Sequence, residues 1–262
     1  MRNSGMSEFS RSYSNFEIRE CVSSLINSPE NATDLAKIIS NERIRFKESY
    51  IGCDSNGKEV LGACKSKGLN KLIVVSPSIT SMTRTRFTIA HEIGHLFLHH
   101  GNSKCISTDF DLWRDKHIEE IEANAFAAEL LIPYQAVVPE IKQQDLSYAL
   151  AVSFAERYIT SISTSAIRLV KLDKGMSAVV YHNGVRIAWV VRSQTCPYNL
   201  ETASVDIRSL FQRTSNDKTT VKAKVDPDMW FNGLSDDWIC QEETHFFSKL
   251  KTYLTILNVY EL

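Results

Sequence analysis

The sequence lacks long apolar runs, paired cysteines and any appreciable net charge. None of its hydrophobic stretches approaches the roughly 18 residues of a membrane-spanning helix, and its first residues carry no signal-peptide-like apolar segment. The six cysteines include no Cys-x-x-Cys pair, so neither a disulfide framework nor a cysteine-based zinc site is indicated. We therefore expect a cytoplasmic protein that makes no contact with a membrane.

The net charge of −1 gives the chain no overall attraction to nucleic acid, so any contact with DNA would need a local basic patch. A composition of 43% hydrophobic and 23% charged residues is typical of a globular protein. The 262 residues suffice for one sizeable core with a smaller domain, or for three small modules.

The chemistry-bearing pattern is His-Glu-x-x-His, with His91, Glu92 and His95 inside an apolar, helix-periodic run over residues 86–98. Two histidines four residues apart lie on one face of a helix, so both rings can hold one metal ion. The carboxylate of Glu92 could then reach a water molecule at the open position of the ion. The alternative is a pair of buried core histidines beside a surface glutamate.

A third ligand is expected from the strong helix pattern over residues 119–132, which stops before Pro133. Glu120 and Asn124 share one stripe of this helix with small and apolar residues, whereas Glu119, Glu122 and Glu129 are expected to face solvent. We choose Glu120 as the third ligand and place Asn124 behind the ligands, where it orients them. Glu122 is the second choice, and weaker candidates are His117, His99 and His100.

Taken together, residues 84–99 and the Glu-x-x-Ala-Asn pattern that begins at Glu120 resemble the ImmA/IrrE family of zinc metallopeptidases. The resemblance implies that zinc is the cofactor, that His91 and His95 bind it together with an acidic residue, and that Glu92 is the catalytic base. It also implies a substrate, because members typically cleave a helix-turn-helix repressor. Such cleavage switches on a stress-response, mobile-element or phage-defence operon.

Cys105 lies in the segment 101–116 that joins the two metal-site helices. A thiolate that reached the open position of the zinc would block the water and inhibit the enzyme. The alternative is an ordinary loop cysteine.

Around these helices the pattern predicts an α+β fold for the first region. Helices are expected over 16–25 and 31–39, and strands over 43–47, 59–65 and 71–76. By resemblance to such metallopeptidases, one sheet edge would lie beside the zinc and pair with an extended substrate. The strand over 59–65 is our candidate for that edge.

Residues 145–172 predict two helices separated by a short break, similar to a helix-turn-helix pair. The second helix could enter a DNA groove with a set of polar and basic residues, namely Ser163, Thr164, Arg168 and Lys171. With so few basic residues there, we favour a helical hairpin that packs against the protease core.

After Gly175 the pattern changes to strands, with a hairpin predicted around 182–184. This region predicts a small α+β domain, and in some relatives the corresponding region is GAF-like. We therefore predict a zincin-like metallopeptidase domain over 1–140, a helix-turn-helix-like segment over 141–174, and a sensory or docking domain over 175–262. DNA or a small-molecule activator is left open as a further partner.

The sequence thus predicts a zinc endopeptidase that cleaves a helix-turn-helix repressor. The competing hypotheses are a non-hydrolytic DNA-binding regulator and a toxin-antitoxin component, each with a structural metal site. The glutamate at position 92 favours hydrolysis, since a structural site has no need of that carboxylate.

Overall fold

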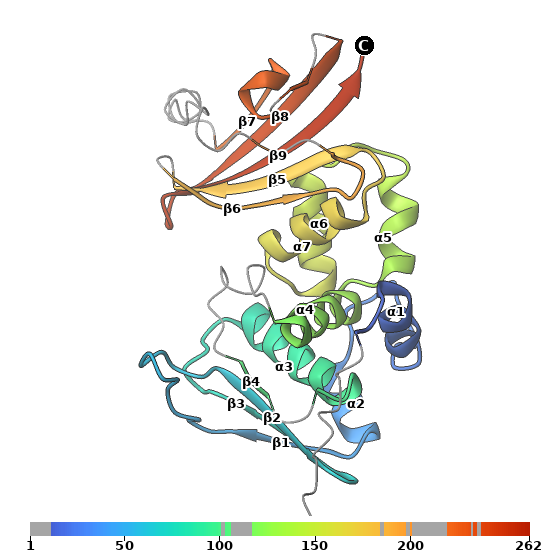
Figure 1. Ribbon diagram of the computed structural model, residues 1–262, viewed down its shortest axis with the longest axis vertical. Coiled ribbons are helices and arrows are strands. Elements are labelled where there is room, and N and C mark those ends of the chain that lie inside the picture. Colours follow the sequence, from blue (N-terminus) through green and yellow to red (C-terminus); the bar gives the residue numbers. More distant parts are fainter. Residues whose placement is uncertain are drawn as a thin grey trace, which may run out of the picture. The chain divides into compact units, whose positions relative to one another are not determined.

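The computed structural model describes residues 12–100, 103–105, 117–183, 186–197, 200, 219–231, 233–234 and 237–262. For 103–105 it describes the backbone alone. The chain divides into two compact units, one of residues 1–28 and 33–131 and one of 29–32 and 132–262. Both combine helices with a sheet, which confirms the α+β fold class (Figure 1). No helix of the described residues has the length and apolar character needed to span a bilayer.

The first unit is a sheet with helices packed on one face (Figure 1). Its sheet has the order β1-β3-β2-β4, in which β1 runs parallel to β3 and the other pairs are antiparallel. Its elements are α1 (Asn15–Ser23), α2 (Leu35–Asn41), β1 (Ile44–Glu48), β2 (Gly62–Lys67), β3 (Asn70–Val75), α3 (Met82–Phe97), β4 (Ser103–Cys105) and α4 (Ile118–Leu131). These positions lie within a few residues of the helices and strands predicted from the pattern.

The prediction that the strand over 59–65 forms a sheet edge is wrong for residues 62–64. β2 begins at Gly62 and lies between β3 and β4, because Gly62–Cys64 pair with β4 on the side away from β3. The edge next to β2 is therefore β4, a strand that the apolar pattern did not reveal because it is three residues long.

Close packing of α3 against α4 depends on Gly94. A Cβ atom at this position would lie 3.1 Å from Cβ of Phe126 and 3.2 Å from the Cα and carbonyl oxygen of Ala123. The glycine thus lets the backbone of α4 approach α3, although it costs about 1 kcal/mol of helix propensity relative to alanine. The two helices that carry the predicted ligands are held side by side by this contact.

The face of α4 opposite α3 is also covered. Glu122 and Glu129 are 3% and 6% exposed, so the expectation that they face solvent is wrong. The reason is α1, which packs on α4 and places Arg19 Nε 3.8 Å from the Glu129 carboxylate. Helical periodicity identifies the faces of α4 but does not reveal that a distant helix covers one of them.

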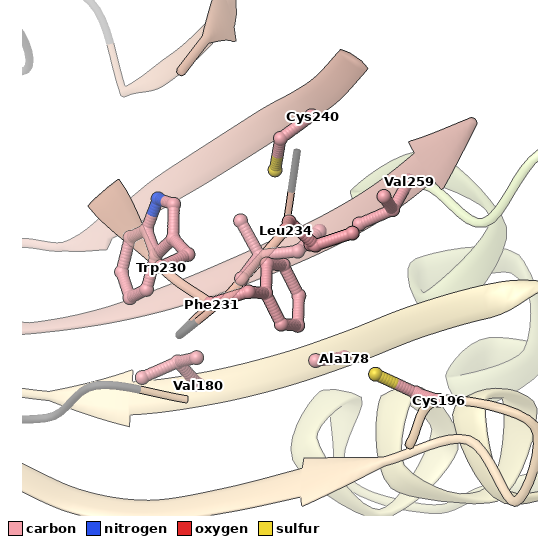
Figure 2. Close-up of a cluster of buried hydrophobic side chains, with 9 residues drawn as sticks. Ala178, Val180, Cys196, Trp230, Phe231, Leu234, Cys240 and Val259 are labelled. Carbon is pink, nitrogen blue, oxygen red and sulfur yellow. The ribbon is translucent and has the colours of Figure 1, made fainter. Parts of the chain in front are cut away.

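The second unit contains a five-stranded antiparallel sheet of order β6-β5-β9-β8-β7. Its elements are α5 (Tyr134–Ile141), α6 (Tyr148–Tyr158), α7 (Ile162–Leu172), β5 (Met176–His182), β6 (Ile187–Arg192), β7 (Thr220–Val225), the short 3-10 helix η1 (Pro227–Met229), β8 (Trp238–Phe247) and β9 (Thr252–Glu261). Trp230 and Phe231 follow η1 and pack on Ala178 and Val180 of β5, which builds the core on one sheet face (Figure 2). The described residues after Gly175 form the expected strands and the short η1, whereas the helices of this unit precede them in the chain. A separate C-terminal α+β domain and its relation to GAF-like domains stay predictions.

Helices α6 and α7 form a helix-turn-helix-like pair, with Ile159 in the left-handed region at φ 53° and Ser161 capping α7. Six consecutive residues of α7, from 165 to 170, are buried, and the helix packs on β5 and β6. Arg168 is 7% exposed and donates from Nε to the carbonyl oxygen of Ile132 at 2.9 Å. The buried residues of α7 pack on strands of its own unit, which differs from the expected packing against the protease core. Ser163 and Thr164 are partly exposed and Lys171 is exposed, so contact of this helix with DNA stays a prediction.

The two units divide the chain between Leu131 and Ile132 and group all of α5–α7 with the C-terminal sheet. The three-part division at 140 and 174 remains a prediction about independently folding parts.

His182 makes the stability of the second unit depend on pH. Its ring is buried, stacks on Tyr253 with centroids 4.9 Å apart, and lies 3.3 Å from the Thr255 hydroxyl. Burial lowers the pKa of His182 to about 4, from 6.5. Between these values the unfolded chain binds a proton that the folded chain does not, so stability falls as the pH is lowered through this window.

We predict that the free energy of unfolding falls by about 2–3 kcal/mol less between pH 7 and pH 4.5 in His182→Gln than in the unaltered protein. The reason is that glutamine keeps a hydrogen-bonding group but does not titrate. The measurement is urea unfolding of both proteins at pH 7 and pH 4.5. Equal losses of unfolding free energy in the two proteins would show that His182 is not the titrating group.

Candidate metal centre

The two histidines of the His-Glu-x-x-His pattern project from α3 toward one point. They are one helical turn apart, 0% and 1% exposed, and the Nε2 atoms of His91 and His95 are 3.0 Å apart. Two buried ring nitrogens this close to each other point to a common position between them. That arrangement is suited to a cation between them.

Glu120 of α4 completes the group. Its carboxylate oxygens lie 3.1 Å from Nε2 of His91 and 3.3 Å from Nε2 of His95. Burial on its own would raise the pKa of Glu120, but the hydrogen bonds and charges of the two histidines hold that pKa well below its ordinary value. The carboxylate is therefore ionised and available as a ligand at neutral pH.

The donor set fits zinc. The three ligand atoms of a tetrahedral zinc site, with bonds of about 2.0–2.1 Å, lie about 3.3–3.4 Å from one another. Here the separations are 3.0, 3.1 and 3.3 Å, and two imidazoles with one carboxylate are a ligand set used in zinc hydrolases. Among the described residues these three are the group of histidine, cysteine or acidic side chains close enough to share an ion.

The second ring nitrogen of His91 lies beside Asn124, with Nδ1 3.0 Å from Oδ1 of the amide. Since an amide oxygen accepts, Nδ1–H of His91 can donate to Asn124, and with an ion bound the lone pair of Nε2 would serve for coordination. Asn124 is 3% exposed and belongs to the same face of α4 as Glu120. The structure thus places it where it can orient a ligand ring.

Glu92 is buried at 0% exposure under the backbone of β2. A Cβ atom on Gly62 would lie 2.7 Å from Oε1 of Glu92 and 2.6 Å from Cγ2 of Thr88. Glycine at position 62 is therefore what allows the strand to lie directly against the carboxylate. The periodic pattern alone did not predict that Gly62 lies against Glu92.

The other acidic and histidine candidates lie outside the ligand group. Glu122 faces His100 and not the ligand group. Nε2 of His100 lies 2.9 Å from Oε2 of Glu122. Burial lowers the pKa of His100, and its hydrogen bond with the Glu122 carboxylate only partly opposes that effect. His99 and His117 are both exposed, so neither joins the three ligands.

Cys105 ends β4, and its backbone pairs with Gly62, the residue that lies against Glu92. The side chain of Cys105 lies outside the part of the chain that the structure describes. The inhibitory role considered from the sequence therefore stays a hypothesis.

The sequence around this site is similar to known proteins. Residues 49–170, which include α3 and α4, match the peptidase M78 model, described as an IrrE N-terminal-like domain. A protein of Bacillus phage phi105, named "Uncharacterized immunity region protein 2", is 38% identical over 76 residues, which cover 29% of this chain and 46% of that protein. The chain thus spans about half the length of this relative.

A solved structure named "Mycobacterium tuberculosis transcriptional regulator" has a similar fold. The match has a TM-score of 0.52 at 10% sequence identity and covers 94% of this chain and 76% of that one. At this identity the likeness supports the fold alone.

We predict that Gly62→Ala lowers hydrolytic activity at least tenfold while the protein stays folded. The new methyl group must displace the carboxylate of Glu92 and the stiff, β-branched side chain of Thr88, so the carboxylate moves away from its position. Ala63→Ser, at the neighbouring position on the opposite face of β2, is the control and should retain activity. Activity and circular dichroism of both variants check this, and a fully active Gly62→Ala would contradict the placement of Glu92.

Proposed function

Residues 49–170 belong to the ImmA/IrrE family of M78 peptidases, and from that premise we propose that the protein is a zinc-dependent endopeptidase. Its substrate in this proposal is a helix-turn-helix transcriptional repressor, and cleavage derepresses a stress-response, mobile-element or phage-defence operon. The observation that carries the proposal is the convergence of two buried imidazoles and one ionised carboxylate, with Glu92 beside them.

His91, His95 and Glu120 would hold the ion. When bound, zinc supplies Lewis-acid chemistry, which lowers the pKa of a coordinated water and polarises the scissile carbonyl. Glu92 accepts the proton of the attacking water and returns it to the leaving amine. Its burial keeps bulk water from competing for the carboxylate.

An extended substrate would bind along β4. This strand ends the sheet order next to β2, and its Cys105 pairs with Gly62 over Glu92. A peptide strand that added itself to this edge would run past the carboxylate and gain backbone hydrogen bonds independent of its side chains. Residues flanking the scissile bond would then be recognised by the side chains around the site.

A repressor is the proposed partner because the phage phi105 relative is named for an immunity region. The burial of α7 disfavours the competing hypothesis of a DNA-binding regulator that reads a groove with this helix. A structural metal site, in that regulator or in a toxin-antitoxin component, would leave Glu92 without a role.

We predict that Glu92→Gln lowers cleavage of a helix-turn-helix repressor substrate by about 10²–10⁴-fold, because glutamine cannot accept the proton. Zinc content should be unchanged, since Glu92 is not a ligand. The measurement is co-expression of the two proteins, followed by detection of repressor fragments and metal analysis of the purified variant.

Glu48→Gln, on the exposed side of β1, is the matched control and should cleave as the unaltered protein does. Cleavage by Glu92→Gln at the same rate, or by neither protein, would contradict the proposed peptidase.

A further inference from the structure

A line of hydrogen bonds continues behind His95 to the opposite side of α4. Nδ1 of His95 lies 3.1 Å from Nδ1 of His100, and Nε2 of His100 lies 2.9 Å from Oε2 of Glu122. The other oxygen of Glu122, Oε1, accepts from the backbone N–H of Tyr13 at 2.6 Å. Apart from His95, these groups lie outside the three-residue ligand set.

The two side chains in the middle of this line are shielded from water. The side chains of His100 and Glu122 are 3% and 4% exposed, and the ring of Tyr13 lies edge-on to His100 with centroids 6.2 Å apart. A buried carboxylate is costly unless it is paired and hydrogen-bonded, and here Glu122 has both an imidazole and a backbone donor. In such surroundings each hydrogen bond restrains its partners more than it would at the surface.

Donors and acceptors fit this line in one consistent order. A ring that presents the lone pair of Nε2 to a metal must carry its proton on Nδ1, so His95 donates to Nδ1 of His100. His100 then carries its own proton on Nε2 and donates to the ionised carboxylate of Glu122. The amide of Tyr13 completes the line from the far side.

The geometry points to a positioning relay, defined as His100 and Glu122, that fixes the tautomer and ring orientation of His95 for zinc binding. We propose that the relay raises the affinity of the site for zinc, and that the start of α1 closes it through the amide of Tyr13. This inference rests on the proposed function only in taking zinc as the ion. The two ligand rings are thus oriented differently, His91 by the neutral amide of Asn124 and His95 by the neutral ring of His100, which is hydrogen-bonded to the buried carboxylate of Glu122.

The anchoring of Tyr13 is built into the start of α1. The Ser14 side chain accepts from the backbone of Glu17, and the Glu17 carboxylate accepts from the backbone of Ser14. This capping box fixes the chain directly after Tyr13, which holds its amide toward Glu122. The relay therefore links the metal site to the N-terminal helix.

The test is the zinc affinity of His100→Asn and of His99→Asn in the full chain, measured by competition with a chromophoric chelator. Asparagine at position 100 is too short to join His95 to Glu122, so zinc should bind about 10–100-fold more weakly. His99 is exposed at a φ of 57°, a conformation that asparagine tolerates, so the same substitution there should leave the affinity unchanged.

A double-mutant cycle with Glu122→Gln separates a relay from general packing. The amide oxygen of glutamine still accepts from His100, but the side chain lacks the negative charge. Its NH₂ group would face the backbone N–H of Tyr13, which is also a donor. This variant should therefore weaken zinc binding as well. Because the two residues act through one line, the double variant should lose no more affinity than the weaker-binding single variant. The absorption spectrum of bound cobalt should change in both single variants and stay the same in His99→Asn.

Zinc affinity equal to that of the unaltered protein in both relay variants would overturn the relay while leaving the peptidase intact. Strictly additive losses, or losses that only follow a lower melting temperature of the metal-free protein, would assign these residues to packing and overturn it too. If the unaltered protein bound no zinc, the relay and the proposed function would both fail.

Discussion

The close approach of α3 and α4 at Gly94 is the contact on which the site depends. With no side chain at this position, the backbone of Ala123 lies against α3, and Glu120, one turn earlier on α4, reaches both His91 and His95. Separation of the helices by one methyl group would move the carboxylate relative to the rings by a distance comparable to a metal–ligand bond. Helix packing therefore sets the distances between the Glu120 carboxylate and the two ring nitrogens.

Burial of so many polar groups requires that each has a partner, because an unsatisfied buried donor or acceptor costs about 1–3 kcal/mol. The remaining ring nitrogens of the two histidines face Asn124 and His100, and His100 in turn faces Glu122. These hydrogen bonds fix the ring orientations and the tautomers, and the tautomers decide which ring nitrogens present a lone pair. The stability of the core and the readiness of the site for a metal thus have the same physical origin.

The sequence predicts those parts of the site that depend on helical periodicity. The spacing of residues 91–95 and the stripe that joins Glu120 to Asn124 each follow from 3.6 residues per turn, and the structure brings these side chains together. What periodicity omits is the identity of the neighbouring element. The burial of Glu122 depends on α1, and the contact with Tyr13 joins residues 109 positions apart, so neither could be inferred from local pattern. The same holds for β4, which is too short to give a strand signal.

The most direct test of the account is the position of zinc in crystals of the protein grown with the metal, read from an anomalous difference map at the zinc absorption edge. The account predicts one strong peak about 2.0–2.2 Å from Nε2 of His91, Nε2 of His95 and a carboxylate oxygen of Glu120. A peak bound instead by His100 or Glu122, or no peak at the three predicted ligands, would contradict it.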